Sequence, residues 1–118
     1  MLQIIMRVRQ RAIWSWEGFV HVWQTEASLM QWIVANMGSG ILAFILPLSA
    51  SERGLVLMGG IFVLAAECMN TAIERVVDDI GMHRRDHAKQ AKDCGSAAVA
   101  VTAVGVGVAW GCIIIGLF

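Results

Sequence analysis

The sequence has little charge, no glycine-rich phosphate loop and no paired cysteines, and each of these absences excludes a class of protein. Only 15% of the 118 residues are charged, whereas 58% are hydrophobic. The mean hydropathy of +0.67 is far above that of soluble domains, in which roughly a quarter of the residues are charged. The length allows one domain at most. We therefore predict a small membrane protein.

Nucleotide-binding loops and nucleic-acid-binding tracts are also absent. Neither G-x-x-x-x-G-K-[ST] nor G-x-G-x-x-G occurs, so soluble kinase folds are excluded and any nucleotide has to be held by side chains. The formal net charge is +0, and no basic tract with interleaved aromatic residues indicates nucleic acid as a partner.

The cysteines and the N-terminus carry no processing or redox pattern. Cys68, Cys94 and Cys112 contain no C-x-x-C pair, so we interpret them as small apolar packing residues. The first residues include arginines but no apolar core followed by a small-residue cleavage site. They do not resemble a signal peptide, and we expect them on the mature protein.

Three long apolar stretches cover residues 28–49, 54–80 and 95–118. Each meets the length of about twenty residues that a transmembrane helix needs. A short polar turn, residues 49–54, connects the first two stretches, and a longer charged linker, residues 81–94, connects the last two. The third stretch has no charge and contains small residues, so we expect helix packing and self-association from it, but no chemistry.

Residues 1–26 are predicted to form an amphipathic helix. Its apolar residues recur at steps of three and four: Ile5, Val8, Ala12, Trp16, Phe19 and Trp23. Such a stripe beside a basic flank is typical of a helix that lies in the membrane interface, and packing against protein explains it equally well. The predicted fold class is all-α, with this interfacial helix and three transmembrane helices in a single domain, residues 1–118.

The basic residues set the predicted orientation. With three spans, the N-terminal segment and the linker 81–94 share one side of the membrane. That side carries most of the basic residues: Arg7, Arg9, Arg11, Arg84, Arg85, Lys89 and Lys92. The turn 49–54 has only Arg53. The positive-inside rule therefore places the N-terminus and the linker in the cytoplasm.

A polar stripe interrupts the second apolar stretch. Its members are spaced by three, four and four residues and share one helical face: Glu67, Asn70, Glu74 and Asp78. Arg75 and Asp79 are spaced to pair along the helix, so a solvated, locally paired helix end is the alternative for this region. Glu67 has no basic residue within helical reach. An ionisable residue inside the membrane is a functional candidate by default, and a buried carboxyl suits a general base.

Glu26 and Glu74 are predicted to lie at similar heights near the cytoplasmic boundary. Glu26 directly precedes the first span, and Glu74 lies about one and a half turns before the second span ends. Two carboxylates there, beside a basic linker, suit magnesium and a polyphosphate. Taken alone, Glu26 is better explained as an interfacial residue near a helix start, and only its combination with Glu74 favours a metal site.

Four blocks occur in order along the chain: WSWEGF at 14–19, TEAS at 25–28, AECMNTAIERVVDDIG at 66–81 and AKDCGSAAV at 91–99. Together they resemble the prokaryotic diacylglycerol kinase family of small integral-membrane lipid kinases. The third block resembles the family pattern E-x-x-N-[ST]-A-I-E-x-x-V-D, and the fourth resembles A-K-D-x-[GA]-[SA]-A-A-V. The similarity covers nearly the whole chain.

The resemblance implies magnesium- and ATP-dependent phosphorylation of a lipid hydroxyl at the cytoplasmic face of a bacterial inner membrane. It implies a homotrimer whose neighbouring subunits share active sites, with Glu67 as the catalytic base and Glu26 and Glu74 as metal ligands. Asn70 and Asp78 are implied to support them. The implied ATP-binding residues are Arg7, Trp14, Glu26, Glu74, His83, Arg84, Arg85, Lys92 and Asp93. The implied lipid-binding residues are Ser15, Trp16, Gln31, Ser96 and Trp110.

Some positions depart from the family pattern. The linker is more basic and lacks an acidic residue often present there, Trp14 stands where tyrosine is common, and Trp32 replaces a carboxylate. Diacylglycerol is the expected substrate, because the N-terminal and AKDCGSAAV blocks resemble that branch, and undecaprenol is the alternative. Outside this family, a deep glutamate also fits a small proton-coupled transporter, and a structural membrane subunit without activity is the third hypothesis.

Overall fold

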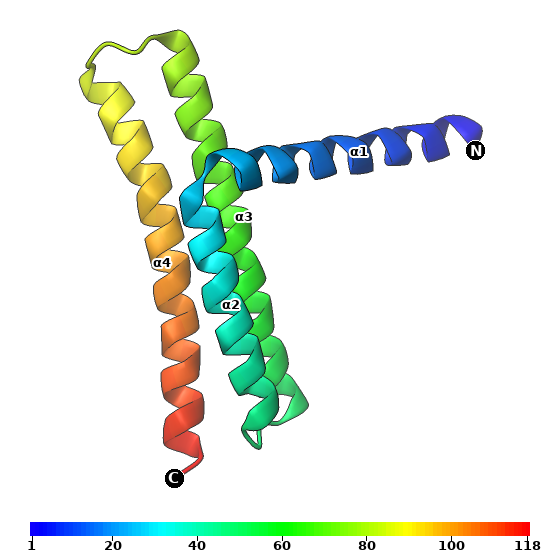
Figure 1. Ribbon diagram of the computed structural model, residues 1–118, viewed down its shortest axis with the longest axis vertical. Coiled ribbons are helices and arrows are strands. Elements are labelled where there is room, and N and C mark those ends of the chain that lie inside the picture. Colours follow the sequence, from blue (N-terminus) through cyan, green and yellow to red (C-terminus); the bar gives the residue numbers. More distant parts are fainter.

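The computed structural model describes all 118 residues, which form four α-helices. They are α1 (Leu2–Thr25), α2 (Ala27–Ile45), α3 (Ala50–Ile80) and α4 (Asp86–Gly116). Helices α2, α3 and α4 form an elongated bundle, and α1 projects sideways from it (Figure 1). The last three helices are long and apolar enough to cross a membrane. The all-α class and the three candidate spans are therefore confirmed.

The turn between α2 and α3 comes earlier in the chain than predicted. Leu46 adopts an extended backbone (φ −76°, ψ 151°), as the residue before a proline prefers, and Pro47 cannot continue a helix. Ser49 then caps α3, because its side chain accepts from the Glu52 amide while the Glu52 carboxylate accepts from the Ser49 amide. The assignment of residues 49–54 to a turn was therefore wrong, and the S-x-x-E spacing was the signal for the earlier helix start.

Arg53, in the first turn of α3, stabilises the connection between α2 and α3. Its Nε donates to the carbonyl oxygen of Ala43 (2.9 Å) and its Nη2 to that of Leu48 (3.3 Å). The guanidinium also lies 4.9 Å from the centre of the Phe44 ring. A cation on the last carbonyls of α2 complements the negative end of the helix dipole.

The second linker is much shorter than predicted. Helix α4 begins at Asp86, so only residues 81–85 connect it to α3, and residues 86–94 are helical rather than part of a loop. This segment is rich in alanine, lysine and glutamine, which favour helix, and Lys89 pairs with Asp93 one turn later. Charge was mistaken for a loop signal, although neither glycine nor proline occurs between residues 82 and 94.

Helix α3 is the central element of the bundle. One of its faces is buried against α2 and α4, along a ridge that consists of Val56, Gly60, Val63, Glu67 and Thr71. Only 12 of the 118 residues are buried, and many large apolar side chains of the bundle are exposed. Nothing in the chain lies against the open sides of Gly107 and Gly111, so this predicted packing surface is unused within one chain.

Two asparagine side chains lie against glycines of neighbouring helices. Asn36 of α2 donates from Nδ2 to the carbonyl oxygen of Gly60 (2.9 Å), and a Cβ on Gly60 would come within 2.6 Å of the Asn36 Oδ1. The Asn70 carboxamide of α3 packs closely against Gly95 of α4, although its hydrogen bond goes to Glu74 and not to the Gly95 backbone. Glycine at these two positions lets a polar side chain reach the backbone of the next helix.

We predict that Gly60→Ala destabilises the bundle by about 1–3 kcal/mol, because the new methyl group displaces the Asn36 carboxamide from its hydrogen bond. Gly54→Ala in the same helix is the matched control, since no atom lies within 4 Å of its added Cβ, and we expect a gain of about 0.5–1 kcal/mol. Both values are measured by far-UV circular dichroism during unfolding with SDS in mixed micelles. Equal effects of the two substitutions would contradict a stabilising role for the contact between Asn36 and Gly60.

Candidate active site

The length of α3 places its polar stripe at one membrane boundary. A helix of 31 residues is about 46 Å long, whereas the hydrocarbon core is about 30 Å thick. If the capped end at Ser49 lies at one boundary, the other boundary falls near Asn70. Glu74 and Asp78 then extend beyond the hydrocarbon, and Glu67 lies about one turn inside it.

Glu67 combines burial with the absence of a polar partner. The residue is only 5% exposed, and none of the three ion pairs of the chain includes it. Thr71 Oγ1 donates to the Glu67 backbone carbonyl oxygen (3.0 Å), which leaves the carboxylate free. Within the chain, no Lys, Arg or His side chain forms an ion pair with Glu67.

The Glu67 carboxylate opens into a cleft of about 290 Å³ between the three bundle helices. The cleft is lined by Ser28, Trp32, Glu67, Asn70, Ser96, Val99 and Ala100. The structure thus brings together the predicted base, the predicted supporting residue Asn70 and the predicted lipid-binding residue Ser96. A hydroxyl-bearing ligand that enters this cleft meets a carboxylate acceptor and a serine hydroxyl.

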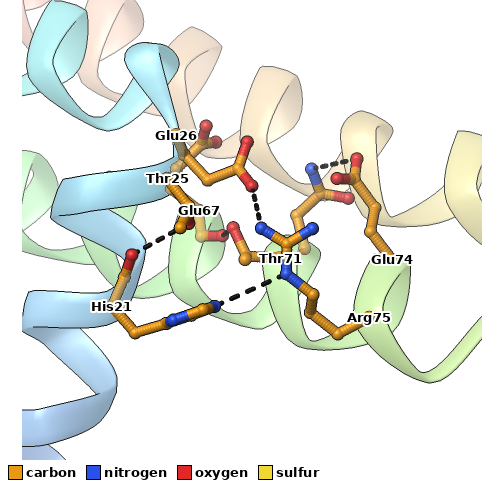
Figure 2. Close-up of polar contacts among 8 residues, drawn as sticks. His21, Thr25, Glu26, Glu67, Thr71, Glu74 and Arg75 are labelled. Carbon is orange, nitrogen blue, oxygen red and sulfur yellow. Dashed lines mark hydrogen bonds and ion pairs between the residues drawn. The ribbon is translucent and has the colours of Figure 1, made fainter. Parts of the chain in front are cut away.

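Glu26 is held by a cation that the sequence analysis had paired elsewhere. Arg75 Nη2 lies 2.7 Å from Glu26 Oε1, and its Nε donates to His21 Nε2 at 3.5 Å. Figure 2 shows the Arg75 guanidinium between these two side chains. Arg75 therefore pairs with the α1–α2 junction and not with Asp79 along its own helix. The contact brings Glu26 within reach of a residue adjacent to Glu74.

Glu74 is engaged by a different partner on the same helix. Asn70 Nδ2 donates to Glu74 Oε1 (3.3 Å), and the Asn70 Oδ1 is buried without a hydrogen-bond partner. Glu74 and Glu26 are both drawn in Figure 2, and their carboxylates are bound to separate groups. Consecutive residues of a helix point about 100° apart, so Arg75 holds Glu26 on a different side of α3 from Glu74.

The predicted nucleotide-binding residues of the linker surround one open pocket. A cleft of about 240 Å³ lies where α3 ends and α4 begins, and it is lined by Val77, Asp78, Gly81, Met82, His83, Arg84, Arg85, Ala88, Lys89, Lys92 and Asp93. Lys92 Nζ lies 2.5 Å from Asp78 Oδ1. This ion pair joins α4 to α3 at the pocket, which is rich in cations suited to phosphate.

The Arg85 guanidinium forms its hydrogen bonds with backbone carbonyl oxygens at the C-terminal end of α3. Its Nη2 donates to the carbonyl oxygens of Val77 (3.1 Å) and Gly81 (2.9 Å) at the C-terminal end of the helix, where carbonyl groups need partners from outside the helix ladder. The Arg85 Nε is buried and has no partner. Arg85 therefore closes the helix end at the wall of the pocket, whereas His83 and Arg84 are exposed there.

Other predicted site residues lie apart from these clefts within one chain. Arg7 and Trp14 are exposed on α1, which projects away from the linker (Figure 1). Trp16 and Gln31 are also exposed. One chain therefore does not assemble all the residues that the sequence blocks implied.

The remaining lipid-binding candidates line separate hollows. Ser15 lines a cleft of about 360 Å³ between α1 and α3. Trp110 Nε1 donates to Ser39 Oγ (2.8 Å), about 21 Å along α4 from Ser96. Trp32 lines both the Glu67 cleft and the hollow beside Trp110, so its indole separates the two. Sequence reasoning assigned Trp32 no role, and no local signal shows such a position between two hollows.

The donor set fits magnesium together with a polyphosphate. No group of three or more His, Cys, Asp or Glu side chains converges in the chain, so the protein forms no complete metal cage. Magnesium, however, is usually held by one or two carboxylates together with water and substrate phosphates. Glu26 and Glu74 supply oxygen donors of this kind, and a cation already lies on Glu26.

The fold and the site define an all-α polytopic membrane protein with an acidic site at one end of its bundle. A family model described as prokaryotic diacylglycerol kinase matches residues 13–114. The chain is 33% identical over 112 residues to a diacylglycerol kinase of Pseudomonas aeruginosa, with 95% of this chain and 91% of the relative covered.

Two further relatives carry the same description. A diacylglycerol kinase of Escherichia coli K12 is 35% identical over 109 residues, with 92% of this chain and 88% of the relative covered. One from Helicobacter pylori is 27% identical over 112 residues, with 95% and 88% covered. The chain therefore belongs to the prokaryotic diacylglycerol kinase family, as the sequence blocks indicated.

We predict that Asp78 and Lys92 stabilise the protein as a pair. Asp78→Asn and Lys92→Met each lose a partly exposed ion pair, which is worth about 0.2–1 kcal/mol. The double variant is expected to lose less than the sum of the two single variants. SDS unfolding of the four proteins measures this coupling. Strict additivity would show that the contact contributes nothing to stability.

Proposed function

We propose that this chain, a diacylglycerol kinase by its family, transfers the γ-phosphoryl group of ATP to the free hydroxyl of diacylglycerol, with Glu67 as general base. The observation that carries this proposal is the buried, unpaired Glu67 carboxylate, which opens into a cleft shared with Ser96. The cationic pocket at the start of α4 supports nucleotide binding at the same end of the bundle. Product and leaving group are phosphatidic acid and ADP.

Glu67 takes the proton of the lipid hydroxyl as the hydroxyl oxygen attacks the γ-phosphorus and the bond to the β-phosphate oxygen breaks. Its position about one turn inside the hydrocarbon suits a substrate that enters from the bilayer, while Glu26 and Glu74 face the incoming nucleotide. Ser96 orients the lipid hydroxyl beside the carboxylate. Phosphoryl transfer depends mainly on such positioning and on charge stabilisation.

Glu26 and Glu74 are the proposed ligands of a magnesium ion that accompanies ATP. When bound, the ion neutralises the charge of the β- and γ-phosphate oxygens. Lys92 leaves Asp78 and contacts the phosphates, with His83, Arg84 and Asp93 around the nucleotide. Arg85 acts mainly by holding the pocket wall at the end of α3, and Asn70 orients Glu74.

The proposed assembly is a homotrimer that shares active sites between subunits. Two findings support it: Arg7 and Trp14 lie away from the nucleotide pocket within one chain, and the bundle exposes apolar sides with the free small-residue surface of α4. A neighbouring α1 would bring its aromatic and basic residues to the pocket. In this arrangement α1 lies in the cytoplasmic interface of the bacterial inner membrane, with the Ser15 and Trp16 side chains toward the lipid substrate.

We predict that Glu67→Gln lowers turnover by at least about a hundredfold, because a general base contributes 10²- to 10⁴-fold. The protein is expected to stay folded, since amide and carboxylate have the same shape. Glu17→Gln, on the exposed face of α1, is the matched control and should keep its activity. The assay follows labelled phosphate from ATP into diacylglycerol and undecaprenol offered in parallel in mixed micelles.

Each outcome of this assay has one meaning. Transfer mainly to diacylglycerol supports the substrate assignment, whereas faster transfer to undecaprenol reassigns the lipid. Full turnover in Glu67→Gln removes this residue from the mechanism. A wild-type protein that transfers phosphate to neither lipid is no lipid kinase, and proton-coupled transport is then the next activity to measure.

A topology experiment tests whether nucleotide can reach the site. In a variant with all three cysteines replaced by alanine, Met82→Cys in the linker should react with a membrane-impermeant maleimide only from the cytoplasmic side. Ser51→Cys at the opposite end of α3 should react only from the outer side. The reverse pattern would place the cationic pocket away from cellular ATP and refute the proposed mechanism.

A further inference from the structure

The Glu26–Arg75 contact raises a question that the proposed catalytic roles leave open. Glu26 is the single residue between α1 and α2 and serves as the N-cap of α2, yet its carboxylate makes no capping hydrogen bond. Its one charged partner is Arg75, at 2.7 Å. The proposed metal ligand is therefore already neutralised by a cation of the chain itself.

This ion pair is accessible to an incoming metal. The side chain of Glu26 is 22% exposed and that of Arg75 is 46% exposed, so neither partner is sealed in the bundle. The guanidinium is also held from its other side, where its Nε donates to His21 Nε2. Figure 2 shows that the Arg75 side chain reaches from α3 toward Glu26, and that His21 of α1 contacts the same guanidinium.

Arg75 and magnesium compete for the same carboxylate, that of Glu26. A magnesium ion shared by Glu26 and Glu74 requires oxygen atoms of both carboxylates about 2.0–2.1 Å from the ion. Glu74 is bound by Asn70 and points to a different side of α3 from Arg75. A metal ion shared with Glu74 therefore competes with Arg75 for Glu26, whose Oε1 the Arg75 Nη2 already contacts.

We propose that Arg75 is a resting-state counter-ion that competes with magnesium for Glu26 and so raises the metal concentration at which the site fills. This inference rests on the proposed role of Glu26 as a metal ligand. In the resting protein, the positive charge of Arg75 balances the negative charge of the Glu26 carboxylate. A bound metal takes over that neutralisation, and Arg75 is a positioning residue rather than a catalytic one.

The expected size of the effect follows from the exposure of the pair. A partly exposed ion pair shifts an equilibrium by up to about fivefold. Metal binds only to the protein in which Glu26 is free of Arg75. Removing Arg75 makes every molecule competent, so the apparent dissociation constant of the metal falls by the fraction that was competent before. We therefore expect Arg75→Ala to lower the dissociation constant of the metal about two- to fivefold.

The test is a titration of the detergent-solubilised full-length protein with Mn²⁺, followed by electron paramagnetic resonance. It is done without nucleotide and with a non-hydrolysable ATP analogue. Arg75→Ala and Arg75→Gln should both bind Mn²⁺ more tightly than wild type, whereas Arg75→Lys, which keeps the charge, should stay close to wild type. Arg9→Ala removes an exposed arginine of α1 and should change nothing. Two uncharged replacements guard against one that fails to fold.

Activity gives a second readout. In Arg75→Gln, the curve of turnover against Mg²⁺ concentration should shift to lower concentration by the same factor, with an unchanged maximum. If Mn²⁺ binds Arg75→Gln as in wild type or more weakly, while Glu26→Gln weakens Mn²⁺ binding, Glu26 is a ligand but Arg75 does not compete for it. If Glu26→Gln binds Mn²⁺ as wild type does, the assignment of Glu26 as a ligand fails, and the competition fails with it.

Discussion

The structure depends on one electrostatic constraint: several carboxylates of α3 and of the α1–α2 junction lie toward one end of an otherwise apolar bundle, and cations from other parts of the chain pair with two of them. Glu26 is neutralised by Arg75, and Asp78 by Lys92. The first pair joins the α1–α2 junction to α3 and the second joins α3 to α4, so these charges also hold the helices together at that end. Glu67 differs from both, because it is buried and belongs to none of the ion pairs, and a buried carboxylate without a charged partner is costly.

The opposite end of the bundle satisfies its polar groups permanently. Arg53 closes the end of α2, and the Ser49–Glu52 capping box starts α3. Between the two ends, Asn36 on Gly60 and Asn70 on Gly95 lock the helices at fixed heights. Gly95, which packs against Asn70, directly precedes Ser96 in α4. The contact between Asn70 and Gly95 therefore also fixes the height of Ser96 relative to Glu67. The two ends therefore differ: one is closed by helix caps and backbone contacts, and the other carries ion pairs between side chains.

Much of the fold was readable from the sequence, and the misses have specific causes. Apolar length gave the three spans, and the spacing of Glu67, Asn70 and Glu74 gave their shared face. The start of α3 differs from the prediction because the S-x-x-E capping box begins the helix at Ala50, and residues 86–94 are helical because charged residues such as lysine favour helix as readily as loop. The Glu26–Arg75 pair could not be read from spacing, since 49 residues separate the two positions. The same holds for Trp32, whose place between two hollows depends on how three helices pack.

The sequence by itself determined that the chain spans a membrane, that one helix carries an acidic face, and that Glu67 has no cation within reach along that helix. These properties follow from local spacing and composition, because helical geometry fixes which residues share a face. Only the tertiary structure decided which cation neutralises which carboxylate. Across the bundle, pairing depends on the heights and rotations of separate helices, and these are set by packing contacts such as Asn70 on Gly95 that no local pattern specifies.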